Sequence, residues 1–156
     1  MIIREMSRKE CRDLLAQLSF GRLGCAYRNQ PYVLPIYFAY NTNHLYGFAA
    51  MGQKIRWMRS NPLVCVEADE VRRHDDWTSV VAQGRYEEIL DTPKHASLRS
   101  AVQALLEKRS MWWQTGFAAA QTRRQYKPQV PVFFSIHIKQ ITGLRASPDP
   151  APVYIG

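Results

Sequence analysis

The sequence lacks the marks of several common classes of protein. No apolar run in its 156 residues is long enough to cross a bilayer as a helix, and the start MIIREMSRKE contains no apolar signal-peptide core. The three cysteines, Cys11, Cys25 and Cys65, are too few and too widely spaced for a disulfide framework or a CxxC metal site. These absences predict a soluble, cytoplasmic protein with reduced cysteines.

Motifs for catalysis by side chains alone are also missing. The four histidines occur singly, without HExxH or any paired spacing that zinc requires. There is no GxSxG elbow, and no cysteine has a histidine partner nearby in the sequence. The chain has no GxGxxG turn within a βαβ rhythm, which argues against a Rossmann domain. We therefore predict no metal site and assign no catalytic residue.

The composition is that of one globular domain. Apolar residues make up 46% of the chain and charged residues 22%, a balance that allows a real core and disfavours disorder. The net charge of +8 favours anionic partners in general. Because the basic residues are dispersed, except at Arg72-Arg73 and Arg123-Arg124, we interpret the surplus as a solubility feature. A nucleic-acid-binding barrel that uses these arginines and exposed aromatic residues is an alternative that we favour less.

The pattern along the chain predicts a mainly β protein with peripheral helices. Ser7 and Glu10 form a capping box at the start of a helix over 8–18. Aromatic and β-branched segments predict six strands, at 20–27, 31–40, 44–49, 63–68, 76–90 and 131–146. Further helices are expected at 53–60, from Pro93 onward and in part of 111–127. We expect a small antiparallel barrel over 1–146 and a proline-rich, loosely ordered tail over 147–156.

Two glycines stand at informative places. Gly84 inside the strand over 76–90 predicts a bulge or a close approach to the backbone. Gly52, Gln53 and Lys54 stand where a strand ends and a helix begins. Free N–H groups, the positive end of the helix dipole and a lysine meet there, which suits a phosphate. A strand–helix junction with a solvent-pointing lysine explains this turn equally well.

The order of four segments points to a known family. These are FGRLG at 20–24, PYVLPIYFAY at 31–40, LYGFAAMGQKIRWMRSNPLVCVEADE at 45–70 and WTSVVAQGRYEEI at 77–89. Together they resemble the FMN-binding split-barrel superfamily, in the pyridoxamine 5′-phosphate oxidase-like branch that includes the nitroimidazole-resistance proteins. The resemblance spans about residues 5 to 146. It implies a six-stranded antiparallel split β-barrel that forms a homodimer, with FMN in two clefts at the dimer interface.

The resemblance also implies contacts with the cofactor. Lys54 would contact the FMN phosphate, helped by Gln53 and the backbone of Gly52; many relatives carry arginine where Gln53 stands. The other contacts that it implies are Phe48 and Ala49 beside the ribityl chain or ring, backbone groups of Pro35 and Ile36 along the isoalloxazine, Ser79 reaching the flavin of the partner subunit, and Trp112 covering the ring.

The resemblance implies redox chemistry on a small organic substrate. Since a flavin carries that chemistry itself, a missing catalytic motif is expected. The last strand, FFSIHIKQITGLRASPDP, lacks the arginine and histidine motif with which pyridoxamine phosphate oxidases hold their substrate. Gly47-Phe48 stand where nitroimidazole-resistance proteins carry histidine. We therefore predict an FMN-dependent oxidoreductase for a nitroaromatic or quinone-like acceptor. The alternatives are an F420-dependent reductase, a flavin carrier, and a haem-binding protein that uses His44 or His137.

Overall fold

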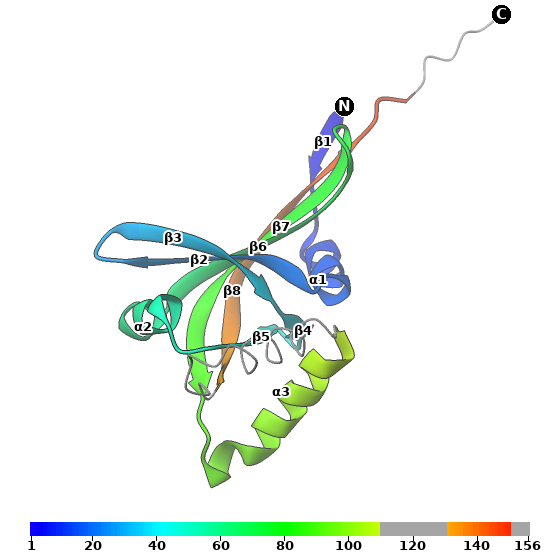
Figure 1. Cartoon of the computed structure of the whole chain (residues 1–156). Coiled ribbons are helices and arrows are strands. Elements are labelled where there is room, and N and C mark those ends of the chain that lie inside the picture. The colour runs from blue at the N-terminus through cyan, green and yellow to red at the C-terminus, as the bar shows by residue number, and fades with distance from the viewer. Residues whose placement is uncertain (110–130, 151–156) are drawn as a thin grey trace, which may run out of the picture.

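The computed structural model describes residues 1–109 and 131–150 as one antiparallel sheet with helices around it (Figure 1). The described strands are β1 (Ile2–Glu5), β2 (Phe20–Tyr27), β3 (Gln30–Tyr37), β4 (Ala39–Asn41), β5 (His44–Ala49), β6 (Leu63–Arg73), β7 (Asp76–Ile89) and β8 (Val132–Ser147). The helices in the same ranges are α1 (Arg8–Gln17), α2 (Gln53–Ser60) and α3 (Ala96–Arg109), which the 3₁₀ turn η1 (Pro93–His95) precedes. No described helix has the length and apolarity that a membrane crossing needs. The predicted fold class, mainly β with peripheral helices, is confirmed.

The sheet is organised around β8. The strand order is β3-β2-β6-β7-β8-β5-β4, and β1 also pairs with β8. One edge of β8 pairs with β7 from Phe133 to Ala146. The other edge pairs first with β5, over residues 132–137, and then with β1, over residues 144–147. As a result β8 belongs both to the curled part of the sheet and to a projecting arm, formed by β1, the tip of the β6–β7 hairpin and the end of β8 (Figure 1).

Two apolar clusters hold the helices against the sheet. The main core contains Leu15 of α1 and Ile55 of α2 packed with strand residues such as Val66, Val80 and Ile136. A second cluster lies on the opposite face, where Val102 and Leu106 of α3 pack against Ile89 and Phe133 together with Ala39. Each helix thus covers the sheet with its apolar side, as amphipathic helices do.

Local signals in the sequence account for several boundaries. Ser7 Oγ accepts the Glu10 N–H at 3.2 Å, and the Glu10 carboxylate accepts the Ser7 N–H at 2.8 Å, so the predicted capping box is confirmed. The β2–β3 and β4–β5 turns contain pairs with positive φ, Arg28-Asn29 at 50° and 63° and Thr42-Asn43 at 46° and 63°. Paired residues of this kind form the tightest hairpin connections.

Some strand predictions need correction. The strand predicted over 31–40 is divided at the buried Phe38 into β3, which pairs with β2, and β4, which pairs with β5. The strand predicted over 63–68 continues to Arg73, since its polar second half pairs with β7. β1 was not predicted; its partner, the end of β8, lies at the opposite end of the chain. The helix predicted within 111–127 lies outside the described residues.

Both features predicted at Gly84, a bulge and a close approach to the backbone, occur in the structure. The β7–β8 register shifts between Gln83 and Gly84. A Cβ at Gly84 would collide with the carbonyl oxygen of His137 and lie 2.9 Å from Cγ2 of Ile136. The bulge and the close backbone approach are therefore confirmed.

Substitution of Gly84 tests this close approach. Gly84→Ala is expected to lower the free energy of unfolding by about 1–3 kcal/mol, because the colliding carbonyl belongs to a central strand that cannot move aside. Urea denaturation followed by circular dichroism measures the change. The neighbouring Gln83→Ala, at an exposed position, should stay within about 0.5 kcal/mol of the wild type. Equal stability of the two variants would contradict the close approach.

Candidate functional site

The N-terminus of α2 is an open helix start. Gly52 is its N-cap residue, and no side chain in the described ranges caps the helix. Among the residues that the structure describes, the nearest atom to a Cβ built at Gly52 is Ala50 O, at 3.9 Å, so these residues leave the space in front of the turn open. Arg56 N–H makes a helical bond back to Gly52 O at 3.1 Å, whereas the N–H groups of the first turn have no acceptor within the helix. Such a terminus attracts anions.

Lys54 adds a positive charge to this helix start. Its side chain is half-buried, and burial lowers the pKa of its ammonium group. The charge interacts with the Cys25 thiol, whose own pKa burial raises. Over residues 1–109 and 131–150, Lys54 forms no ion pair. The cations that do form ion pairs there include Arg4, Lys9, Arg22, Arg59, Arg72, Arg73 and Arg99.

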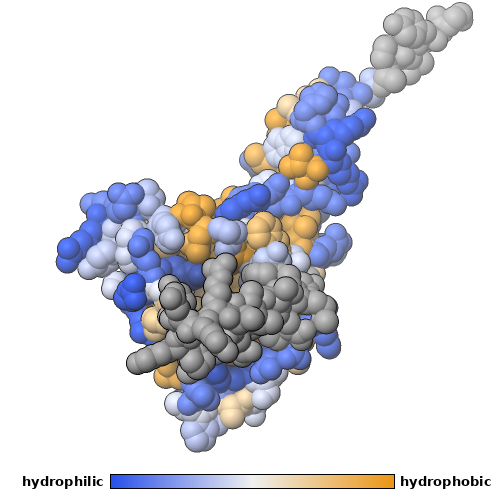
Figure 2. Space-filling model, viewed as in Figure 1, coloured by the Kyte–Doolittle hydropathy of each residue, from blue (hydrophilic) through white to orange (hydrophobic). Residues whose placement is uncertain are grey.

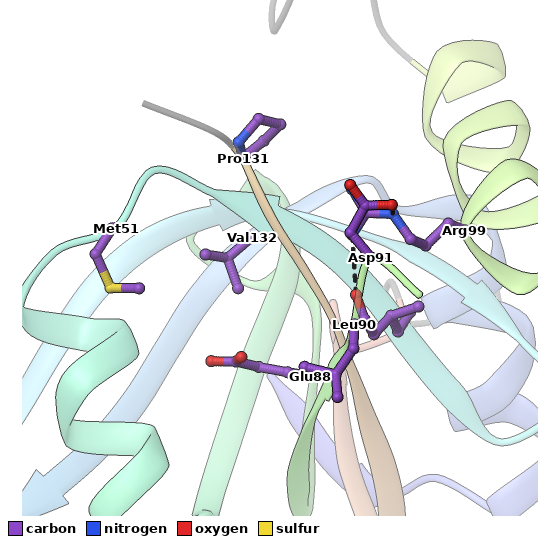
Figure 3. A pocket seen from close by; sticks show the side chains of 8 residues that line it. Met51, Glu88, Leu90, Asp91, Arg99, Pro131 and Val132 are labelled. Carbon is purple, nitrogen blue, oxygen red and sulfur yellow. Dashed lines mark hydrogen bonds and ion pairs between the residues drawn. The ribbon is translucent and has the colours of Figure 1, made fainter. Parts of the chain in front are cut away.

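A cavity of about 380 Å³ adjoins the same turn (Figure 3). It brings together the loop before α2, the end of β7 with the loop that follows, the start of β8, and α3. Its lining residues are Met51, Glu88, Ile89, Leu90, Asp91, Arg99, Pro131 and Val132. No pattern in the sequence pointed to this set, because its members come from segments far apart in the chain.

Two charged groups in this cavity are held in place by neighbours. Glu88 accepts hydrogen bonds from Arg59 at 2.5 and 3.1 Å and from the Tyr86 hydroxyl at 3.0 Å. The bond with Arg59 is the main reason why the pKa of Glu88 lies below its usual range. The Arg99 guanidinium lies 4.6 Å from the centre of the Phe133 ring and donates to Ile89 O at 2.9 Å. Both side chains therefore have fixed orientations.

Ser79 lies on a different surface. It lines a groove of about 820 Å³ beside the basic residues Arg8, Arg12 and Lys139, and this groove shares none of its described lining residues with the cavity at Met51. The Ser79 hydroxyl donates to Glu67 at 2.9 Å. Within one chain, the structure thus does not bring Ser79 to the Lys54 turn.

The other candidate residues named from the sequence differ in how far their side chains are buried. Pro35 is exposed on β3, the edge strand of the sheet, whereas the Ile36 side chain is buried in the main core. Ala49 is buried in the same core, and the Phe48 ring packs in the α3 cluster, 5.8 Å from Phe133. Only backbone groups of Ile36 are therefore suited to a ligand. Trp112 lies outside the described residues.

Two histidines that are distant in sequence stack on each other. The rings of His44 and His137 lie 4.6 Å apart at an interplanar angle of 13°, because β5 pairs with β8 at these positions. Lys139 Nζ lies 3.2 Å from His137 Nδ1. Neither histidine lines the two cavities described above. Their proximity depends on strand register, which single residues in the sequence do not reveal.

The basic residues at the tip of the β6–β7 hairpin pair with nearby acids. Arg72 bonds Glu70 at 3.3 Å, and Arg73 lies 3.6 Å from Asp75. Their charges are thus largely balanced within the hairpin, which does not favour a nucleic-acid contact there. Arg123 and Arg124 lie outside the described residues.

Comparison with known proteins gives consistent matches over nearly the whole chain. The chain is 38% identical over 146 residues to an uncharacterized protein of Rhizobium meliloti (strain 1021), covering 94% of this chain and 97% of that one. It is 40% identical to an FAD-binding protein from Mesorhizobium loti of known crystal structure, with a TM-score of 0.78 and coverage of 95% and 99%. An FAD-binding protein from Mycobacterium smegmatis matches in fold, with a TM-score of 0.60, 22% identity and coverage of 90% and 97%.

The match to a known family extends over most of the chain. Residues 7–145 match the family described as pyridoxamine 5′-phosphate oxidase, a range that includes β2 to β7 and nearly all of β8. The antiparallel sheet and the open turn before α2 agree with the segments that first suggested this resemblance. The chain therefore belongs to the pyridoxamine 5′-phosphate oxidase-like family of split-barrel proteins.

Proposed function

We propose that this chain is a flavoprotein that binds the 5′-phosphate of FMN, free or as part of FAD, at the start of α2. The observation that carries the proposal is Lys54, a half-buried ammonium without an ion pair in the described ranges, next to an uncapped helix N-terminus. The 40% identity to an FAD-binding protein supports a flavin as the ligand.

The electrostatics of the turn suit a phosphate group. Burial disfavours the charged form of an ammonium group unless a partner compensates it. A phosphate would supply that compensation, and its oxygens can also accept bonds from the N–H groups of Gln53 and Lys54. The open space in front of Gly52 leaves room for this approach.

The proposed activity is an oxidoreductase reaction on a small nitroaromatic or quinone-like acceptor. When bound, a flavin supplies the hydride or electron transfer itself. The chain's part is then to hold the phosphate at Lys54 and to present backbone groups of the edge strand β3, at Pro35 and Ile36, to the ring. Haem is less favoured, because His44 and His137 stack on each other and line neither cavity.

We also propose that the active form is a homodimer with the flavin between subunits. Ser79 and Lys54 lie on separate surfaces of one chain, so a second copy is needed for both to reach one flavin. The arm also exposes apolar side chains, as Figure 2 shows. They include Ile2, Ile3, Val71 and Leu144. Exposed apolar residues gathered in this way are typical of association surfaces.

Lys54→Ala tests the phosphate site. Loss of a charge-assisted bond is expected to weaken FMN binding by roughly 1.5–3 kcal/mol, while riboflavin, which lacks the phosphate, keeps its affinity. Calorimetric titration with each ligand measures the difference. Arg56→Ala removes the same charge from an exposed position of α2 and should leave FMN affinity unchanged. Equal losses for FMN and riboflavin would place Lys54 away from the phosphate.

Turnover tests the proposed chemistry. The flavin-loaded protein should oxidise reduced nicotinamide with a quinone-like or nitroaromatic acceptor faster than the same concentration of free flavin, since binding orients the ring. The reaction rate is measured from the decrease in absorbance of the reduced nicotinamide. Reduced F420 as the electron donor with the same acceptors, followed by the absorbance of the oxidised F420 that forms, tests the F420-dependent alternative. Rates equal to those of the free cofactors would favour a flavin carrier over an enzyme.

Sedimentation equilibrium tests the dimer. The wild type is expected at twice the chain mass. Leu144→Lys, on the arm, should shift it toward the monomer, because burying a lysine there is unfavourable. Leu98→Lys is the matched control, as Leu98 is 42% exposed on α3 and Leu144 is 43% exposed. A monomeric wild type would overturn the interface site.

A further inference from the structure

We infer that the cavity beside Met51 receives the adenosine half of FAD, so that the native cofactor of this chain is FAD. The inference rests on the proposed function, because it requires a flavin phosphate at the start of α2. It adds a second binding site, built from Leu90, Asp91 and Arg99, that neither the sequence nor the family match assigns.

The position of the cavity fits the covalent structure of FAD. The second phosphate and the adenosine follow the FMN phosphate directly, so the nucleoside must lie close to the group that binds that phosphate. Met51 lines the cavity and precedes Lys54 by three residues in the chain. Three residues span at most about 10 Å. A phosphate at Lys54 therefore leaves the rest of the molecule within reach of the cavity.

The walls of the cavity suit a purine. Its volume of about 380 Å³ is within the usual range for small-molecule sites. Met51, Ile89, Leu90 and Val132 give it a mostly apolar lining. Bases bind surfaces of this kind through their flat apolar faces. Figure 3 shows Met51 and Val132 on one side, facing Leu90 and Arg99 on the other.

The Arg99 guanidinium is held in an orientation that suits stacking on a purine ring. Its guanidinium lies over the Phe133 ring at 4.6 Å and is held by Ile89 O, and its side chain is only 18% exposed. A planar, always charged group with a fixed orientation stacks well on aromatic rings. Ordering it costs little on binding, since the protein has already fixed it.

Asp91 supplies the hydrogen-bond acceptor that a ribose needs. Glu88, the other carboxylate of the cavity, already accepts bonds from Arg59 and Tyr86. Asp91 is 83% exposed, and the contact that the structure gives it is an ion pair with Arg99 at 3.7 Å. Its carboxylate can therefore accept bonds from ribose hydroxyls, the role that acidic residues have in other dinucleotide sites.

Calorimetric titration with FAD and with FMN tests the inference on the wild type, Leu90→Trp and Asp91→Asn. The wild type should bind FAD about tenfold or more tightly than FMN. Leu90→Trp narrows the cavity, and Asp91→Asn weakens the hydrogen-bond acceptor for the ribose. Each variant should therefore lose most of the preference for FAD over FMN and leave FMN affinity unchanged. Both changes fall on an exposed loop. AMP should compete with FAD and leave FMN binding unaffected.

Matched controls and the possible outcomes separate this inference from the proposed function. Leu98→Trp and Asp13→Asn make the same changes at exposed positions outside the cavity and should keep the preference for FAD. Equal affinities for FAD and FMN in the wild type would overturn the adenosine site and leave the flavin proposal standing. If the cavity variants lost equal affinity for FAD and FMN, with melting temperatures unchanged, the adenosine site would also be overturned. Failure of the wild type to bind either flavin would overturn both.

Discussion

The register of β8 against its two neighbours is the constraint on which the rest of the structure depends. Val132 pairs with Ala49 of β5, and Phe133 pairs with Ile89 of β7. The end of β5, the end of β7 and the start of β8 therefore meet at one place. The chain that leaves β5 begins α2 there, and the chain that leaves β7 turns toward α3. The Lys54 turn and its adjoining cavity are direct consequences of this meeting.

Charge pairing distinguishes Lys54 from the structural cations. Arg59 joins α2 to β7 through Glu88, Arg22 joins β2 to β6 through Glu67, and Arg99 joins α3 to the end of β7. Each of these cations stabilises the contact between two elements. Lys54 is half-buried without such a partner in the described part of the chain. An unmatched charge of this kind lowers stability unless a ligand offsets it, which makes Lys54 the candidate group for binding an anionic ligand.

The sheet separates the features of the proposed site between two surfaces. The Lys54 turn lies at the curled end of the sheet, whereas Ser79 lies in the groove beside α1 on another surface. The Phe48 ring is separated from these features as well, because it packs in the apolar cluster of α3. What the β5–α2 connection then offers to a ligand is mainly backbone, one lysine and the apolar Met51. Such a surface suits a cofactor that brings its own chemistry.

The sequence by itself determined the features that depend on residues close together in the chain. The capping box of α1, the bounds of α2, the strands 20–27 and 44–49, and the open Gly52–Lys54 turn all follow from patterns a few residues long. The family segments gave the fold class in the same way. Only the tertiary structure decided the pairing of β1 with β8, the stacking of His44 on His137, and the union of Met51, Asp91 and Arg99 around one cavity. The physical reason is that strand register is set by packing and hydrogen bonding over the whole sheet, so distant residues meet only after the sheet has formed.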